Sequence, residues 1–170
     1  RVLTTHHGYQ TLLWRGMISI VPDQNALRSE MSTMTRITSE ALGRDRPMAD
    51  LVLGPAARLL HHAEALRTLT GKASALIPVR DFIDGDQMIE LRPAAAVPSY
   101  QIGFAQHTCV NVNGIDIETL HPGPAHSVGL GTTMMPHFMN LFPHVSNIGC
   151  FGTMVAPRLR KADLDLLIVA

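Results

Sequence analysis

The feature that most constrains the fold is a change of hydrophobic period near residue 75, from helical spacing to twofold alternation. Two tight-turn sequences, Asp84-Gly85 and Asn113-Gly114, lie inside the alternating part. Asp-Gly and Asn-Gly accept the positive φ angles that hairpin turns require. The apolar runs around these turns cover residues 76–83, 87–92, 100–112, 115–120 and 126–130. We therefore expect an antiparallel meander of four or five strands over residues 75–131, with Pro78 marking the first strand as an edge.

Two helical stripes precede this sheet. Apolar residues recur at spacings of three and four between Pro22 and Gly43, and again between Pro55 and Gly71. Proline is favoured in the first helical turn and glycine just after the last one. We therefore predict that residues 22–71 are helical, whereas residues 1–21 form a short strand or an apolar arm. Helices followed by an antiparallel sheet define the α+β class, which is the predicted fold class.

Regular patterning stops after residue 131. Residues 132–157 are apolar but irregular, and they contain Cys150, the second of only two cysteines. Irregular segments of this length that pack on a sheet are commonly functional. Residues 158–170 return to a helical spacing and are predicted to form a last helix. The irregular cysteine-bearing loop is therefore the first place to look for chemistry.

Composition excludes several classes of function. The 170 residues suit a single domain, and fourteen basic side chains balance fourteen acidic ones, so neither a nucleic acid nor a membrane surface is an expected partner. Two cysteines make no disulfide framework, no signal-like segment opens the chain, and no apolar run reaches the roughly 18 residues of a membrane span. We expect a cytoplasmic protein with reduced thiols. The start at Arg1 and the end inside a predicted helix suggest a fragment of a longer protein.

Cys150 is the leading candidate for a nucleophile. A thiolate attacks a carbonyl or thioester carbon when it is exposed and has backbone donors or a cation nearby. Gly149 and Gly152 let the backbone come close on both sides of it. His144 and Asn147 are predicted to orient a substrate or to stabilise an oxyanion. The alternative is that Cys150 is a buried small hydrophobe, as free cysteines commonly are.

The histidines suggest two other kinds of site. Five of the nine fall in one part of the chain: His107, His121, His126, His137 and His144. With Cys150 they could form a zinc site, but no CxxC, HxxxH or HExxH spacing is present, and we predict neither a metal nor a cofactor. A Cys-His-Asp hydrolase is the other kind, although no protease signature surrounds the cysteine. Its triad would consist of Cys150, Asp116 and either His126 or His144.

The segment around Cys150 resembles the active site of a known family. The matching residues are Pro143-His144-Val145-Ser146, then Gly149, then Cys150-Phe151-Gly152. The segment resembles the active-site sequence of the ubiquitin-conjugating enzymes, especially of their divergent bacterial relatives. The predicted order of helix, meander, irregular cysteine loop and helix is similar too. The resemblance implies that Cys150 accepts the C-terminus of a ubiquitin-like modifier as a thioester and passes it to an amine. It also implies that His144 supports the oxyanion or the loop.

The leading interpretation is ubiquitin-like protein conjugation by a cysteine-dependent transferase, with a ubiquitin-like modifier and its activating enzyme as partners. A rival is a non-enzymatic assembly subunit, which would bind other protein subunits through its apolar N-terminal arm and the methionines near the cysteine: Met134, Met135, Met139 and Met154. Charged residues make up 16% of the chain, below the roughly 25% of average soluble domains, which favours surface buried against a partner. A cysteine hydrolase is the third interpretation.

Overall fold

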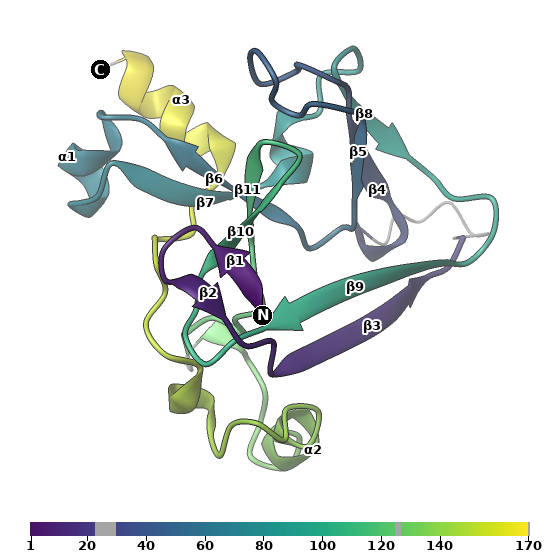
Figure 1. Cartoon of the computed structure of the whole chain (residues 1–170), viewed down its shortest axis with the longest axis vertical. Helices are drawn as coiled ribbons and strands as arrows, with labels where there is room; N and C mark the ends of the chain where they lie inside the picture. Colours follow the sequence, from purple (N-terminus) through teal and green to yellow (C-terminus); the bar gives the residue numbers. More distant parts are fainter. Residues whose placement is uncertain (23–29, 125–126, 170) are drawn as a thin grey trace.

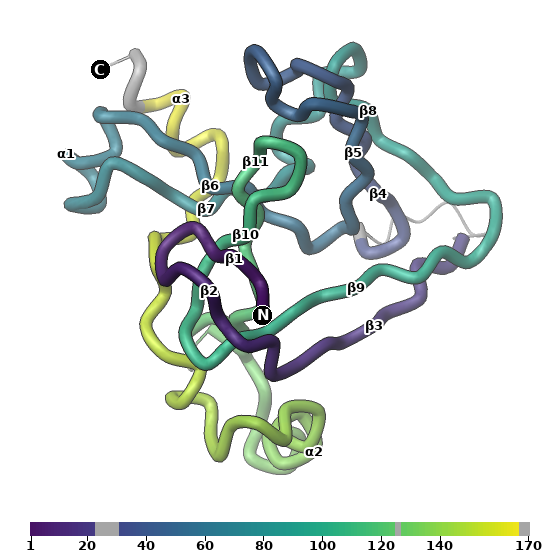
Figure 2. The backbone as a smooth tube through the Cα atoms, viewed as in Figure 1, coloured from purple at the N-terminus to yellow at the C-terminus, as the bar shows by residue number. Residues whose placement is uncertain are grey.

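The chain is built mostly of short antiparallel strands. The computed structural model describes residues 1–22, 30–124 and 127–169. Among these residues the strands form four small sheets and the helices are short (Figure 1). The backbone trace in Figure 2 shows N-terminal strands lying beside strands from the middle of the chain. Within the described ranges, no helix has the length and apolar character needed to cross a bilayer.

A four-stranded antiparallel sheet forms the centre of the fold. Its order is β10-β11-β6-β7, with bounds β10 Cys109–Val112, β11 Ile115–Glu118, β6 Arg58–His62 and β7 Ser74–Pro78. The Asn113-Gly114 turn joins β10 to β11 with positive φ angles of 51° and 88°, which these two residue types adopt readily. This hairpin is the one that the sequence predicts. Its register pairs Cys109 with Glu118, so both side chains lie on one face of the sheet.

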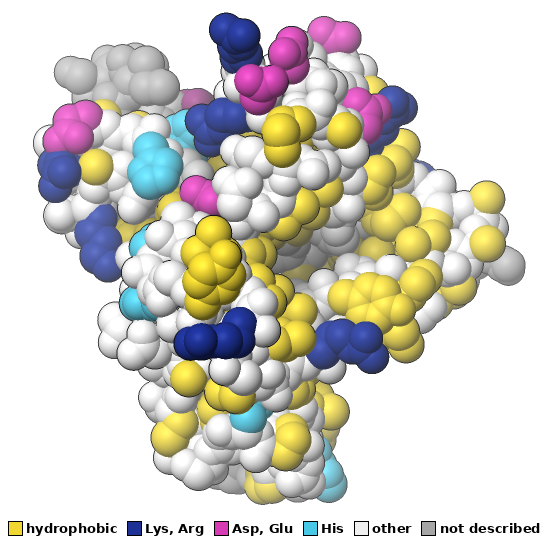
Figure 3. Space-filling model, viewed as in Figure 1, with side chains coloured by type: hydrophobic (Ala, Val, Ile, Leu, Met, Phe, Trp, Pro, Cys, Tyr) yellow, Lys and Arg dark blue, Asp and Glu magenta, His cyan; other side chains and the backbone are white. Residues whose placement is uncertain are grey.

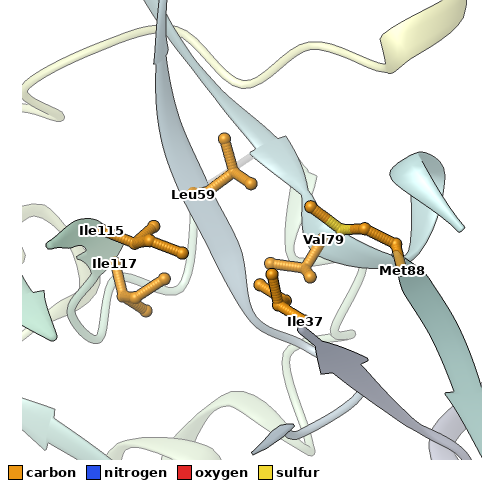
Figure 4. Packing of buried hydrophobic residues seen from close by; sticks show 6 residues of the cluster. All are labelled: Ile37, Leu59, Val79, Met88, Ile115 and Ile117. Carbon is orange, nitrogen blue, oxygen red and sulfur yellow. The ribbon is translucent and has the colours of Figure 1, made fainter. Parts of the chain in front are cut away.

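The other face of this sheet packs against a second, three-stranded sheet. The second sheet has the order β5-β4-β8, with bounds β5 Leu51–Leu53, β4 Met34–Ile37 and β8 Met88–Leu91. Six buried side chains from the two sheets and their connection meet here: Ile37, Leu59, Val79, Met88, Ile115 and Ile117 (Figure 4). Burying such a side chain stabilises a fold by roughly 1.5–3 kcal/mol. This core therefore holds the two sheets together.

The C-terminal part of the chain covers the face that carries Cys109. Leu60, Leu76 and Cys109 are buried there together with Ala156. Beside them, Arg158 forms an isolated parallel bridge with Leu76 of β7, which is the last strand of its sheet. The part of the four-stranded sheet around Cys109 is thus covered on both faces, by the three-stranded sheet on one side and by residues 155–158 on the other.

The helices are short and lie around the sheets. Their bounds are η1 Glu30–Ser32, α1 Leu66–Thr70, η2 Val79–Phe82, α2 Met135–Met139, η4 Ile148–Phe151 and α3 Lys161–Val169. Leu66 of α1 and Leu164 of α3 pack together with Ile77 of β7. This contact places the C-terminal helix beside the end of the four-stranded sheet (Figure 1).

Two pairs of strands lie outside these sheets. β1 (Val2–Thr4) pairs with β2 (Gly8–Gln10), and the N–H of Thr5 donates to the carbonyl of Cys109 at 2.8 Å, which holds this pair against β10. β3 (Trp14–Ile20) and β9 (Val97–Gly103) form a long ribbon that is paired along all seven residues of each strand.

The β3–β9 ribbon carries exposed apolar side chains. Met17 and Tyr100, which pair across it, are 60% and 55% exposed. Figure 3 shows apolar side chains gathered over this part of the molecule. At one end the indole N–H of Trp14 donates to the carbonyl of Leu141 at 2.7 Å, and its ring lies 5.0 Å from that of Phe142. The ribbon is therefore fixed to the segment that follows α2.

The predicted N-terminal helices over residues 22–71 are wrong. Residues 34–37 and 58–62 are strands β4 and β6, and α1 spans only five residues; residues 23–29 of the first predicted helix lie outside the described residues. Thr33, Thr35, Ile37 and Thr38 are β-branched, and β-branching favours strands. The second predicted helix, with its apolar residues from Leu59 to Leu69, is in fact strand β6 followed by the short helix α1. The α+β prediction is therefore corrected to a mostly β fold.

The predicted meander over residues 75–131 is also wrong in its pairing. After β7 the chain turns through η2, and the Asp84 carboxylate accepts the N–H groups of Asp86, Gln87 and Met88, each at 2.9 Å. This closed turn directs β8 to β4 instead of back to β7, and β9 pairs with β3. Residues 127–130 form no strand. Each turn is local, but the partner of each strand is set by distant residues.

Replacing Gly114 by alanine is expected to destabilise the fold more than the same change at Gly85. Both glycines have positive φ, 88° and 83°, which costs a side chain about 1–2 kcal/mol. At Gly114 the new methyl group would also lie 2.3 Å from the carbonyl oxygen of Asp45, whereas at Gly85 it meets no atom within 4 Å. Urea denaturation should therefore show a loss of about 2–4 kcal/mol for Gly114→Ala. Equal losses in the two variants would contradict the steric clash.

Candidate functional site

A cluster of charged and polar side chains, two of them buried and three half-buried, lies at the open end of the β10–β11 hairpin. We call it the buried polar cluster, and its members are Arg58, His107, Glu118, His121 and Arg158. Glu118 is the last residue of β11, and the antiparallel register brings the residues just before β10 next to it. Four members come from the central sheet and its connections. Arg158 comes from the C-terminal segment.

The Glu118 carboxylate is the charged centre of the cluster. Its side chain is only 4% exposed. Arg158 Nε donates to Oε1 at 2.9 Å, and Arg58 Nη1 donates to Oε2 at 3.4 Å. Burial alone would raise the pKa of Glu118, but the contacts from His107, Arg158 and Arg58 outweigh it, and the pKa is lowered. Glu118 is therefore an ionised carboxylate inside the protein.

His107 faces this carboxylate through Nε2. The His107 side chain is completely buried, and its Nδ1 accepts the N–H of Val155 at 3.1 Å. A ring nitrogen that accepts a hydrogen bond carries no proton, so the proton of His107 lies on Nε2. Nε2 is 3.3 Å from Glu118 Oε1, but this approach is outside the geometry of a regular hydrogen bond. His107 thus holds a buried N–H donor that is not fully used.

His121 provides a second ring beside His107. The two ring centroids are 4.9 Å apart in an edge-on arrangement. His121 Nδ1 accepts the N–H of Gly123 at 3.0 Å, and Nε2 lies 3.1 Å from the carbonyl oxygen of Gly152, so Nε2 is the donor. Burial lowers the pKa of His121. The ring is therefore uncharged at neutral pH and contributes shape and polarity.

This arrangement is suited to hydrogen-bond donation at a reacting group. A buried ring N–H costs free energy when it lacks a good partner, and a role in a reaction is one reason why proteins keep such donors. The carboxylate next to it can also stabilise positive charge on the ring. Among the described residues, no group of three or more His, Cys, Asp or Glu side chains is placed to hold a metal ion.

The predicted nucleophile, Cys150, lies at the surface in η4. Its Sγ is 3.3 Å from Ser146 Oγ, and this contact, together with the backbone N–H interactions of the turn, lowers the pKa of the thiol. Asn147 caps the turn, because its Oδ1 accepts the N–H of Gly149 at 2.9 Å. The alternative of a buried Cys150 is therefore wrong. The catalytic roles of Cys150 and Asn147 stay predictions.

His144 points into an aromatic cluster. Its ring centroid lies 6.1 Å from Phe151 and 6.4 Å from both Trp14 and Phe142. Burial lowers the pKa of His144. Its predicted role beside Cys150 is untested and stays a prediction. Of the other residues of the hydrolase triad, Asp116 binds Thr5 Oγ1 at 3.0 Å, and His126 lies outside the described residues.

Sequence reasoning missed Glu118 and Arg158, and it considered His107 only as a zinc ligand. Ile115 and Ile117 are buried on one face of β11, so alternation assigns Glu118 to a face that would be solvated in an isolated sheet. The C-terminal segment covers that face. The available signal was the register of the predicted hairpin, which sets a glutamate directly opposite Cys109.

A family model for the Hint domain matches residues 1–124 of the chain. No curated protein and no solved structure gives a match. The Hint match overturns the resemblance to the ubiquitin-conjugating enzymes, which depended on residues 143–152 and on an element order that the fold lacks. Ubiquitin-like conjugation on Cys150 is wrong for the same reason. The predicted protein partners and cytoplasmic location are untested and stay predictions.

Replacing Glu118 by glutamine is expected to lower the free energy of unfolding by about 3 kcal/mol near neutral pH, because the two arginines lose a buried counter-charge. The pKa of Glu118 is lowered in the folded protein. Its ionisation therefore stabilises the fold above the pKa of an unfolded glutamate, about 4.3, and this stabilisation is lost as the pH falls through the folded pKa. Urea denaturation at decreasing pH should show the two proteins converging. A difference that stays constant down to about pH 2 would argue against an ionised carboxylate.

The two thiols are expected to react at very different rates. Burial raises the pKa of Cys109 to about 12, whereas Cys150 is exposed and its pKa is lowered by Ser146. The thiolate is the reactive form, so iodoacetamide should label Cys150 in the native protein and Cys109 only after unfolding. Ser146→Ala should slow the labelling of Cys150 near neutral pH, as measured by mass spectrometry. Ser127→Ala is the control, because that hydroxyl binds the carbonyl of Pro124 instead. Native labelling of both thiols at one rate would disprove this.

Proposed function

The chain belongs to the Hint domain family, and we propose that it acts in autoprocessing, in which a polypeptide cuts or rearranges one of its own peptide bonds. Hint domains are associated with self-splicing and autoprocessing of the intein and hedgehog type. The observation that carries the proposal for this chain is the buried His107 N–H beside the ionised Glu118. Both residues lie inside the matched range, 1–124.

The burial of the site supports a substrate that belongs to the same polypeptide. The side chain of His107 is completely buried, and that of Glu118 is only 4% exposed. A substrate that diffuses from solution needs an opening to reach such groups. A peptide bond of the same polypeptide can instead be enclosed while the chain folds around it. The position of the cluster therefore favours an intramolecular reaction.

We assign His107 the role of hydrogen-bond donor to the reacting peptide group. When a nucleophile attacks a peptide carbonyl, negative charge develops on the oxygen, and a fixed N–H donor stabilises it. A neutral imidazole can serve as this donor without losing its proton. Val155 holds the ring in the tautomer that places the proton on Nε2. The N–H is therefore set in position before the reaction begins.

The attacking group is not Cys109. Its side chain is completely buried, and burial raises its pKa to about 12, so almost none of it is thiolate at neutral pH. The role of Cys109 is to fill the space between β10 and the C-terminal segment. A different thiol or a hydroxyl must supply the nucleophile.

The test is to follow processing in the full-length polypeptide that contains residues 1–170. Asparagine in place of His107 can still accept the N–H of Val155 from the position of Nδ1, but it has no donor at the position of Nε2. His107→Asn should therefore slow the appearance of cleaved or spliced products about 100- to 1,000-fold, the effect of losing one such donor. Products are separated by electrophoresis and identified by mass spectrometry.

His107→Gln provides a matched comparison, because the longer amide places its N–H near the position of Nε2 and should restore part of the rate. His62→Asn is the control, since His62 is exposed at the end of β6. The proposal is wrong if the wild-type polypeptide stays intact. It is equally wrong if a folded His107→Asn variant is processed at the wild-type rate.

A further inference from the structure

The C-terminal segment reaches the buried polar cluster from outside the matched range. The N–H of Leu76 donates to the carbonyl of Pro157 at 2.8 Å, and the N–H of Leu159 donates to the carbonyl of Leu76 at 3.1 Å. These two hydrogen bonds attach the segment to the edge of β7. Lys72 Nζ also donates to the carbonyl of Val155 at 2.9 Å. The backbone on both sides of Arg158 is therefore held in place.

Arg158 binds the one oxygen of Glu118 that faces His107. Its Nε and Nη2 lie 2.9 Å and 2.8 Å from Oε1, and His107 Nε2 lies 3.3 Å from the same atom. Nη2 also donates to the carbonyl of His121 at 2.6 Å. The planar guanidinium thus joins the carboxylate to the loop after β11. A lysine ammonium has the charge but not this fork of donors.

Arg158 holds Oε1 at a place where the N–H of His107 comes within 3.3 Å of it but does not form a regular hydrogen bond. An arginine–carboxylate contact is charge-assisted and stronger than the hydrogen bond of a neutral ring N–H. Arg58 approaches the other oxygen, Oε2, at 3.4 Å and leaves Oε1 to Arg158. Without Arg158, the carboxylate would be free to turn until Oε1 accepts the N–H of His107.

We propose that Arg158 is a positioning residue of the processing site: by holding the carboxylate of Glu118 in place, it keeps the His107 N–H available for the reacting peptide group. This inference rests on the proposed function. It extends the processing unit beyond residue 124, because Val155 fixes the tautomer of His107 and Arg158 fixes its neighbouring carboxylate.

The first experiment measures processing of the full-length polypeptide with Arg158→Met or Arg158→Lys. Methionine fills a similar volume without charge, and the rate constant should fall about ten- to a hundredfold, the loss expected for a misplaced catalytic group. Lysine keeps the charge and should restore part of the rate. Arg160→Met is the matched control, because Arg160 lies in the same segment and pairs with Asp81 at 2.7 Å instead of with the cluster. Its rate should stay within about twofold of wild type.

The second measurement is the NMR signal of the His107 ring nitrogens and of the Nε2 proton. In Arg158→Met the N–H should bind Glu118 directly, so the Nε2 proton signal should shift downfield while Nδ1 remains unprotonated. Arg160→Met should leave the signal unchanged. An unchanged signal in a folded Arg158→Met protein would overturn the proposal, whatever happens to the rate.

The two measurements separate the two proposals. If the wild-type polypeptide is not processed but the His107 signal shifts in Arg158→Met, the proposed function fails, and with it the role in processing, whereas the control of the His107 N–H by Arg158 stands. If processing requires His107 but neither the signal nor the rate responds to Arg158→Met, the positioning role fails. If Arg158→Met does not fold, the same comparison is made with Arg158→Lys, in which the loss of the fork should still shift the signal.

Discussion

The burial of one negative charge determines how the distant parts of this chain fit together. A carboxylate inside a protein must be matched by cations and donors, because an unpaired buried charge destabilises a fold by several kcal/mol. Glu118 is matched by Arg58 from β6 and by Arg158 from the C-terminal segment. The ion pairs therefore join three elements that no short turn connects. The ring of His107 lies beside these paired charges, with Nε2 3.3 Å from Oε1 of Glu118.

The central sheet separates two kinds of interior. On one face, Ile37, Leu59 and Ile117 belong to an apolar core between two sheets. On the other face, apolar packing around Cys109 adjoins the buried polar cluster. Only the second face places a proton donor and an ionised acid together. Because the apolar core lies behind the sheet, substitutions in the cluster can alter the site while the apolar core stays packed.

The sequence predicts the parts of this structure that depend on neighbouring residues. Asn113-Gly114 identifies the β10–β11 hairpin, since its φ angles are a local requirement. The partner of each strand depends on contacts with distant residues. Apolar residues spaced three and four apart led to the wrong prediction that β4 and β6 are helices. The burial of Glu118 could not be predicted from its neighbours in the sequence either, because it depends on a segment 40 residues later. Ten residues around Cys150 gave a resemblance without the fold that would support it, and the longer family match corrected it.

The distance along the chain between Glu118 and Arg158 has a consequence during synthesis. A ribosome adds roughly 5–20 residues per second, so the 40 residues from Thr119 to Arg158 take roughly 2–8 seconds to make. During this interval the nascent hairpin exists without its arginine partner from the C-terminal segment. The reaction proposed here, if it needs both residues, can begin only after Arg158 has been translated. The proposed self-processing would therefore be delayed until the C-terminal segment has been made.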